Sequence, residues 1–324
     1  MLPRCLSLPG SPPGLNEEVN SSLSKPSKHR SAEAKERRFG AALASPALVA
    51  IFAVVLIPLA NALILSFQQR DLARPETDAF VGLGNFIRLA TDARFLNSLR
   101  ATTFFSVTSI LIEIPLAIAI AIVLTKAFKG RGLARALIIL PWALPAVVAA
   151  SMWKWIYNAD FGVLNALLQQ FGLIDEYRVW LADPGWAMGL IIFSNVWKET
   201  PLTVLLVMGS LMAIPNVLYE AAHIDGATAW QRFRHVTFPL ILPILIVAGL
   251  LQLIWGFQTF EIPQIITGGG PQSATELASL RIYTQTFRSL RFGLGSAMAY
   301  SVAVLLLVPA VVYIRKAHKS IVEM

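Results

Sequence analysis

Six long apolar segments are the strongest constraint on what this chain can fold into. A helix needs about 20 mostly apolar residues to cross the hydrocarbon core of a bilayer. Segments of at least that length lie at residues 41–67, 98–125, 134–157, 186–213, 236–262 and 292–314. Lipid offers no water to bond the backbone, so each spanning segment must be helical. The sequence therefore predicts an all-α, polytopic membrane protein with six transmembrane helices surrounded by membrane lipid.

The composition excludes several other classes of protein. Only 14% of the 324 residues are charged, whereas a soluble domain is about a quarter charged. The net charge of +8 could suggest nucleic-acid binding. The basic residues, however, cluster just outside the apolar segments, as orientation signals do, so we expect no nucleic-acid partner. Cys5 is the only cysteine, which excludes an internal disulfide and a thiolate metal site.

The charges of the loops predict the topology. The loop after the second span has four basic residues and no acid: Lys126, Lys129, Arg131 and Arg135. The segments before the first span and after the last are also basic, whereas the loop at 158–185 has four acids against one arginine. The positive-inside rule then places both termini and the 214–235 loop in the cytoplasm. The loops at 68–97, 158–185 and 263–291 are expected to face outside.

The chain is expected to have one large domain between two tails. Residues 1–38 are rich in Ser, Pro and charge, and such a segment cannot bury enough apolar surface to become ordered. We predict a disordered, basic cytoplasmic tail there. We expect no signal peptide in this segment, because no apolar run begins before Ala41. Residues 39–318 form the six-span domain with its cytoplasmic loop at 214–235, and residues 319–324 form a C-terminal tail.

The predicted cytoplasmic loop contains an amphipathic segment. Val217, Ala221 and Ile224 recur at helical spacing, and Asn216 could cap a helix that begins near Val217. Gly226 allows a sharp change of direction before a second amphipathic stretch, residues 230–236. Periodicity alone fits two interpretations equally: a helix lying on the membrane surface, or a helix that docks on another protein.

The spacing within this loop resembles a known motif. Glu220-Ala221-Ala222 is followed after three residues by Gly226, and nine residues later by Val236, Thr237, Phe238 and Pro239. This resembles the EAA loop of permease subunits in binding-protein-dependent ABC importers, with Phe238 in place of the usual Leu. A helix lying on the membrane predicts no such fixed distances. The resemblance implies a coupling helix that docks on an ATP-binding subunit through Glu220, Ala221, Ala222, Asp225 and Gly226.

Further segments resemble the permeases of carbohydrate importers of the maltose and glycerol-phosphate type. They occur in the family's order over roughly residues 41–318: Trp153 with residues 158–165, then 195–201, 257–271 and 292–297. The maltose-transporter permease has extra spans and a large external domain, and we expect neither in this chain. The resemblance therefore implies a compact permease of six spans with the maltose-type fold.

Polar residues inside the spans are candidates for a solute pathway. A charge at the centre of a span costs about 2.5–3.5 kcal/mol, so it should face a partner or a wet cavity. In span four Asn195, Glu199 and Leu202 share a helix face. In span five Gln252, Trp255 and Thr259 form one stripe whose amide, indole and hydroxyl suit a sugar. Interhelical hydrogen bonding is the alternative, and sequence alone slightly favours it. The resemblance places these six residues in the substrate region.

Two intramembrane charges are left without a role. Glu113, beside Pro115, has no obvious partner and is interpreted as structural or subunit-facing. Lys198 lies one step off the face of Glu199 and is expected to pair with an acid elsewhere. The three glycines at 268–270 are not followed by Lys-Ser/Thr, so they form no P-loop. We find no catalytic constellation, metal site or cofactor motif.

The resemblance implies a permease subunit of an ABC importer in a bacterial-type cytoplasmic membrane. It would import an oligosaccharide, a disaccharide or a polyol phosphate by ATP-driven alternating access. Its expected partners are a homologous second permease, a dimer of ATP-binding subunits that hydrolyse ATP, and an extracytoplasmic solute-binding protein. A permease for a non-sugar solute is the first alternative. An ATP-independent secondary carrier or a membrane receptor is the second, although a carrier should show internal repeats.

Overall fold

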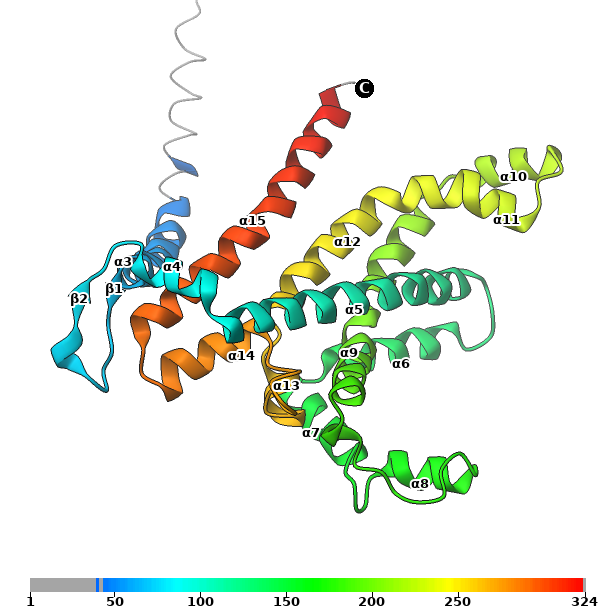
Figure 1. The fold of residues 1–324 in the computed structure, drawn as a ribbon. Coiled ribbons are helices and arrows are strands. Elements are labelled where there is room, and N and C mark those ends of the chain that lie inside the picture. Colours follow the sequence, from blue (N-terminus) through cyan, green and yellow to red (C-terminus); the bar gives the residue numbers. More distant parts are fainter. Residues whose placement is uncertain (1–38, 41–42, 323–324) are drawn as a thin grey trace, which may run out of the picture. The chain divides into compact units, whose positions relative to one another are not determined.

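The structure is a computed structural model that describes residues 39–40 and 43–322 (Figure 1). The tail predicted at residues 1–38 lies outside the described residues, and so do the last two residues of the predicted C-terminal tail. The chain divides into two compact units, Met1–Asn61 and Ala62–Met324. A helix from Leu43 to Ser66 corresponds to the first predicted span. It contains a π-helical turn, η1 (Phe52–Leu56), and then α3 (Ile57–Ser66) with Pro58 in its first turn.

Helices and helical turns make up most of the second unit. In chain order they are η2 (Pro75–Thr77), α4 (Gly84–Thr91), α5 (Ala93–Thr125), α6 (Arg131–Ala143), α7 (Ala146–Ile156), α8 (Val163–Gln170), η3 (Trp180–Ala182), α9 (Pro184–Met212), α10 (Asn216–Ile224), α11 (Ala229–Arg232), η4 (Phe233–Thr237), α12 (Phe238–Gln258), α13 (Glu261–Ile266), α14 (Ala278–Tyr283), η5 (Thr284–Arg288) and α15 (Phe292–Val322). The last helix extends beyond the predicted span at 292–314 and into the predicted tail.

The third predicted span consists of two helices. α6 and α7 meet at an angle of 94°. Leu144, between them, has an extended backbone with φ −74° and ψ 138°, because a following proline disfavours the helical conformation. Pro145 then begins the new helix as its N-cap residue. Among the described residues five helical segments are long and apolar enough to cross a membrane, and a sixth is obtained if the bent pair of α6 and α7 counts as one span.

The fold also contains a short sheet that the all-α prediction did not include. β1 (Gln68–Gln69) pairs antiparallel with β2 (Ala79–Phe80) just after the first span. The side-chain amide of Asn85 in α4 donates to the carbonyl oxygens of Ser66 and Gln68, both at 2.9 Å. These two bonds fasten α4 to the start of the loop that contains the sheet.

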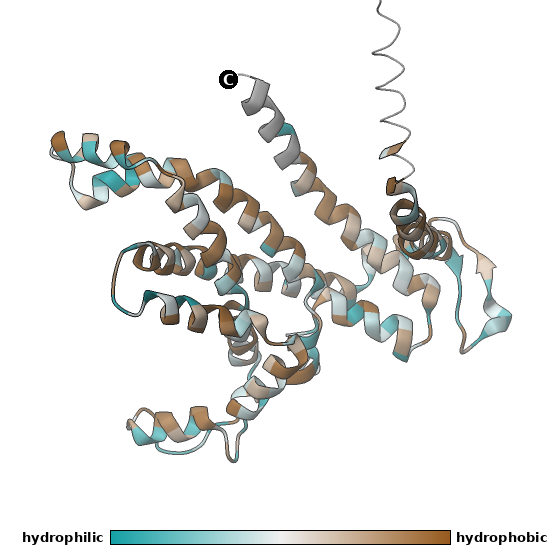
Figure 2. Ribbon diagram, turned by 180° about the vertical axis from the view of Figure 1, so that it is seen from behind, coloured by the Kyte–Doolittle hydropathy of each residue, from teal (hydrophilic) through white to brown (hydrophobic). Residues whose placement is uncertain are grey.

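Helix α5 is the centre of the apolar core. Phe95 belongs to a cluster with residues of α4, α12 and α15, and Phe105 to a second cluster with residues of α7, α9 and α13. Ala117 and Ala121 belong to a third cluster with residues of α9 and α12. Figure 2 shows apolar residues along α12 and hydrophilic residues gathered at the hairpin of α10 and α11. The hairpin is thus a polar segment at the N-terminal end of the long apolar helix α12.

Candidate functional site

The α10–α11 hairpin is closed by a glycine in the left-handed conformation. Gly226 has φ +72°. Its N–H donates to the His223 carbonyl at 3.1 Å, and the N–H of Ala227 donates to the Ala222 carbonyl at 2.9 Å. This pair of bonds is the Schellman arrangement, which satisfies the last carbonyls of a helix. The predicted change of direction at Gly226 is confirmed.

Helix α11 begins with a capping box. The hydroxyl of Thr228 accepts from the N–H of Gln231 at 3.3 Å, and the side chain of Gln231 accepts from the N–H of Thr228 at 2.7 Å. The expected Asn216 cap of α10 is wrong. Pro215 occupies the N-cap position, Asn216 is already the first helical residue, and no side chain caps this end.

The two sides of α10 have different surroundings. The Tyr219 hydroxyl lies 3.0 Å from the Thr237 hydroxyl, and its ring packs on the apolar cluster of α5, α9 and α12. Val217 and Ile224 lie on the other side, where they are 63% and 85% exposed. Ala221, on the same side, is exposed as well. One face therefore holds α10 to the bundle, and an apolar face remains uncovered within the described chain.

An open hollow of about 390 Å³ lies between α10 and the start of the next span. Three of the predicted coupling residues line it: Ala222, Asp225 and Gly226. Arg232 and His235 line it from the other arm of the hairpin. Glu220 is exposed outside this hollow. The structure thus places all five predicted coupling residues on one helix and the turn that ends it.

On α9 the predicted substrate residues have different environments. Asn195 is 5% exposed, and its amide makes no hydrogen bond within the described residues. Glu199 binds the ammonium of Lys198 at 2.7 Å. The expectation that Lys198 pairs with an acid elsewhere is wrong, because its ammonium pairs with the neighbouring residue Glu199. Leu202 is partly buried.

On α12 the predicted stripe extends past the end of the helix. The helix ends at Gln258, and Thr259 is the C-cap residue. Its hydroxyl donates to the carbonyl of Trp255 at 2.9 Å. The ring of Trp255 is partly buried. The Thr259 hydroxyl is therefore engaged as a donor and can still accept a hydrogen bond.

Gln252 belongs to a buried network that sequence reasoning missed. Its amide nitrogen donates to Glu113 Oε1 at 2.6 Å and to the Thr203 hydroxyl at 3.2 Å. The Thr203 hydroxyl in turn donates to the same Glu113 oxygen. The three residues are 6%, 0% and 1% exposed, in the order Gln252, Glu113 and Thr203. Glu113 thus faces the interior of the helix bundle and not another subunit, and no local pattern could indicate its partners Thr203 and Gln252.

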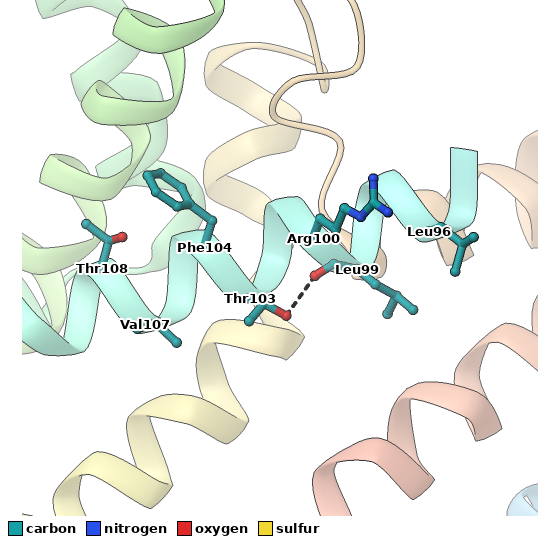
Figure 3. A pocket seen from close by; sticks show the side chains of 7 residues that line it. All are labelled: Leu96, Leu99, Arg100, Thr103, Phe104, Val107 and Thr108. Atoms are coloured by element: carbon teal, nitrogen blue, oxygen red, sulfur yellow. Dashed lines mark hydrogen bonds between the residues drawn. The ribbon is translucent and has the colours of Figure 1, made fainter. Parts of the chain in front are cut away.

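The six predicted substrate residues do not form one bonded cluster. Helices α9 and α12 pack together. In the part of the chain that the structure describes, however, no side-chain hydrogen bond joins the three candidates on α9 (Asn195, Glu199 and Leu202) to the three at α12 (Gln252, Trp255 and Thr259). A larger open groove of about 540 Å³ lies along α5, and none of the six lines it. Figure 3 shows its lining along a single helix, with Arg100 among Leu96, Leu99 and Thr103.

The spans and the hairpin define the class of protein. The chain is a multi-pass α-helical membrane protein with a short, capped helical hairpin between its fourth and fifth crossings. Residues 113–318 match the family described as the inner membrane component of binding-protein-dependent transport systems. The chain belongs to this family of ABC transporter permeases.

Relatives cover nearly the whole chain. The trehalose/maltose transport system permease protein MalF of Thermococcus litoralis is 35% identical, over 87% of this chain and 94% of its own length. The trehalose transport system permease protein SugA of Mycobacterium tuberculosis is 32% identical, over 86% and 89%. The sn-glycerol-3-phosphate transport system permease protein UgpA of Agrobacterium fabrum is 34% identical, over 83% and 90%.

A solved structure has the same fold. It is the crystal structure of a bacterial alginate ABC transporter in complex with an alginate pentasaccharide-bound periplasmic protein. One of its chains matches with a TM-score of 0.74 and 23% identity, over 87% of this chain and 94% of that one. The predicted permease fold is confirmed, whereas the side of the membrane on which the termini lie stays a prediction.

Proposed function

We propose that this chain is the transmembrane subunit of an ABC importer for a carbohydrate: an oligosaccharide, a disaccharide or a polyol phosphate. The observation that carries the proposal is the α10–α11 hairpin, which presents the Glu-Ala-Ala segment and Gly226 on an uncovered surface. The relatives support the solute class, because their names specify trehalose, maltose and sn-glycerol-3-phosphate.

The hairpin is the proposed contact with an ATP-binding subunit. Small side chains at Ala221 and Ala222 allow another surface to approach the helix backbone. The apolar residues Val217 and Ile224 supply area to bury, and that burial is the main source of affinity in such a contact. The hollow beside Gly226 could receive a side chain from the partner. Glu220 and Asp225 add charge at the edge of the contact.

The proposed solute path lies along the polar residues of α9 and α12. The side-chain amide of Asn195 makes no hydrogen bond through its oxygen or its nitrogen within the described chain. The amide nitrogen of Gln252 donates hydrogen bonds to Glu113 and Thr203, and its amide oxygen has no partner in the described residues. The Trp255 ring could stack on a pyranose face, and Thr259 and Glu199 offer oxygens that can accept from sugar hydroxyls. Leu202 would contribute apolar contact.

The proposed cycle requires three kinds of partner in the cytoplasmic membrane. A second, homologous permease would complete the path, and two ATP-binding subunits would close on ATP and move the hairpins. An extracytoplasmic binding protein would deliver the solute to the outward-facing state. Loaded binding protein and ATP must then favour the same conformer, because a ligand shifts an equilibrium only through its differential affinity.

The test is reconstitution of this chain with candidate partner subunits from the same organism: a second permease, an ATPase and a solute-binding protein. Calorimetry on the binding protein with a panel of trehalose, maltose, longer glucans and glycerol 3-phosphate identifies the solute. Uptake of that solute into proteoliposomes should then require ATP, the binding protein and this chain. Uptake of an amino acid, phosphate or metal instead would assign the chain to another solute class. Uptake without an ATPase would make it a secondary carrier.

A further inference from the structure

The buried network of Glu113, Thr203 and Gln252 joins three spanning helices at one point. Both donors converge on a single oxygen, Glu113 Oε1, and Gln252 also reaches the Thr203 hydroxyl, so the three side chains form a closed triangle. The members come from α5, α9 and α12, and their sequence separations are 90, 139 and 49 residues. We call this set of three residues the polar clasp.

The polar clasp lies between separate apolar layers on every helix it joins. On α5, Phe105 precedes Glu113 in one cluster, and Ala117 follows it in another. On α9, Val196 and Val204 flank Thr203 in the same way. On α12, Leu245 precedes Gln252 in the cluster of Ala117, and Phe257 follows it in a third cluster. The clasp thus separates two apolar clusters along each of the three helices.

The layer next to the clasp is the one that supports the coupling hairpin. Ile214, just before α10, is part of the cluster that contains Ala117 and Val204, and Tyr219 of α10 packs against that cluster. Four of the candidate solute residues lie on the other side of the clasp along their helices, and Gln252 belongs to the clasp itself: Asn195 and Glu199 precede Thr203, and Trp255 and Thr259 follow Gln252. Along α9 and α12 the clasp therefore lies between the hairpin and these four residues of the proposed path.

The helices that carry the clasp are held at close range. A Cβ atom on Gly256 would clash with the Ser106 hydroxyl, so α5 and α12 approach each other one turn from Gln252 as only glycine permits. Apolar side chains in a membrane bundle gain little from being buried against each other in preference to lipid. Hydrogen bonds have defined partners and directions, so they can hold the relative register of these helices where apolar contact alone would let it slip.

We propose that Glu113 is a positioning residue that makes α5, α9 and α12 move together when the hairpin moves. The proposal rests on the proposed importer function. With the clasp intact, displacement of α10 and its apolar layer shifts the polar residues of α9 and α12 as a unit. Without it, the hairpin and its layer can move while the path does not, and ATP is hydrolysed without transport. The residue touches neither solute nor ATP, and it acts through Thr203 and Gln252.

The test compares variants that differ only in the clasp. Glu113→Leu removes the acceptor, and Thr203→Val removes one donor with almost no change in shape. Glu113→Gln keeps one oxygen for both donors, while its amide nitrogen replaces Oε2, which is buried without a partner in the described chain. Thr200→Val is the matched control, because the Thr200 hydroxyl bonds only the Val196 carbonyl of its own helix, at 2.6 Å.

The measured quantity is the number of ATP molecules hydrolysed per solute imported, in proteoliposomes with equal amounts of assembled complex. Loss of a buried partner should raise this ratio by about fivefold or more in Glu113→Leu and Thr203→Val. Glu113→Gln and Thr200→Val should stay within about twofold of the wild-type chain. The double variant Glu113→Leu/Thr203→Val should be no worse than Glu113→Leu alone, because both changes break one unit.

Two results would overturn the proposal. If Glu113→Leu and Thr203→Val reduce assembly or thermal stability but keep the wild-type ratio, the clasp only holds the bundle together. If Thr200→Val raises the ratio as much as Thr203→Val, loss of any buried hydroxyl on α9 is sufficient and the clasp has no special role. Failure of the wild-type complex to import any sugar contradicts the importer function instead, so the two failures are distinguishable.

Discussion

Gly226 offers the sharpest test of the coupling hairpin, because its effect can be calculated from backbone geometry alone. Its φ of +72° is in the left-handed region, where a non-glycine residue costs about 1–2 kcal/mol. No atom lies within 4 Å of the position that a Cβ would take. A substitution therefore introduces backbone strain without a clash, and any loss of function reports on the turn itself.

The magnitude follows from the two Schellman bonds that need this conformation. Gly226→Ala should lower the population of the closed hairpin by about 5- to 30-fold relative to the open forms. Gly226→Val should lower it further, because a β-branched side chain tolerates positive φ least. Gly226→Asn should be the mildest of the three, since asparagine adopts the left-handed conformation more readily.

The assay measures ATP-dependent solute uptake and the amount of ATPase that co-purifies with the permease. Uptake and co-purification should both be reduced least in Gly226→Asn, more in Gly226→Ala and most in Gly226→Val, while the permease remains inserted in the membrane. Gly209→Ala is the control: Gly209 lies inside α9, has an ordinary φ and has no atom within 4 Å of the position that a Cβ would occupy. Alanine there should be neutral or mildly stabilising. Wild-type uptake and co-purification in Gly226→Val would refute the docking role of the hairpin.

Two further predictions concern topology and the solute path. Reporter fusions after Lys129 should report the cytoplasm and fusions near Asp175 the outside, because the first loop is basic and the second acidic; an external signal at Lys129 would put the hairpin out of reach of an ATPase. Trp255→Ala and Thr259→Ala should weaken solute-stimulated ATP hydrolysis and transport by about 5- to 100-fold, the loss of a stacking face or hydroxyl partner in a desolvated site. If these two variants reduce only the yield or melting temperature of the complex, the stripe is interhelical packing.

Local sequence patterns predicted the parts of this fold that depend on neighbours along the chain. Spanning segments follow from the length of apolar runs, since a lipid environment leaves the backbone almost no choice but a helix. The turn at Gly226 follows from a glycine between two amphipathic stretches. The missed cap at Asn216 is a local error of one residue, because Pro215 also fits the start of a helix.

The solute residues illustrate what sequence reasoning can reach in a membrane bundle. Helical periodicity grouped Gln252 with Trp255 and Thr259, but periodicity describes only one helix. The structure adds that Gln252 bonds Glu113 and Thr203, whereas Asn195 keeps an unbonded amide within the described chain. The distinction between a side chain that binds other helices and one that is free for a solute lies between helices, where no spacing rule applies.

Apolar length, turn chemistry and motif distances are all read along the chain. They were enough to identify a multi-pass helical membrane protein of the ABC permease type, with a helical hairpin between two of its spans. The packing of the helices was needed to learn that α6 and α7 meet at 94° beside Pro145, and that Glu113 is bonded by residues 90 and 139 positions away. The physical reason is that a buried polar group in lipid must find a partner, but which of many distant partners it finds depends on how the helices pack.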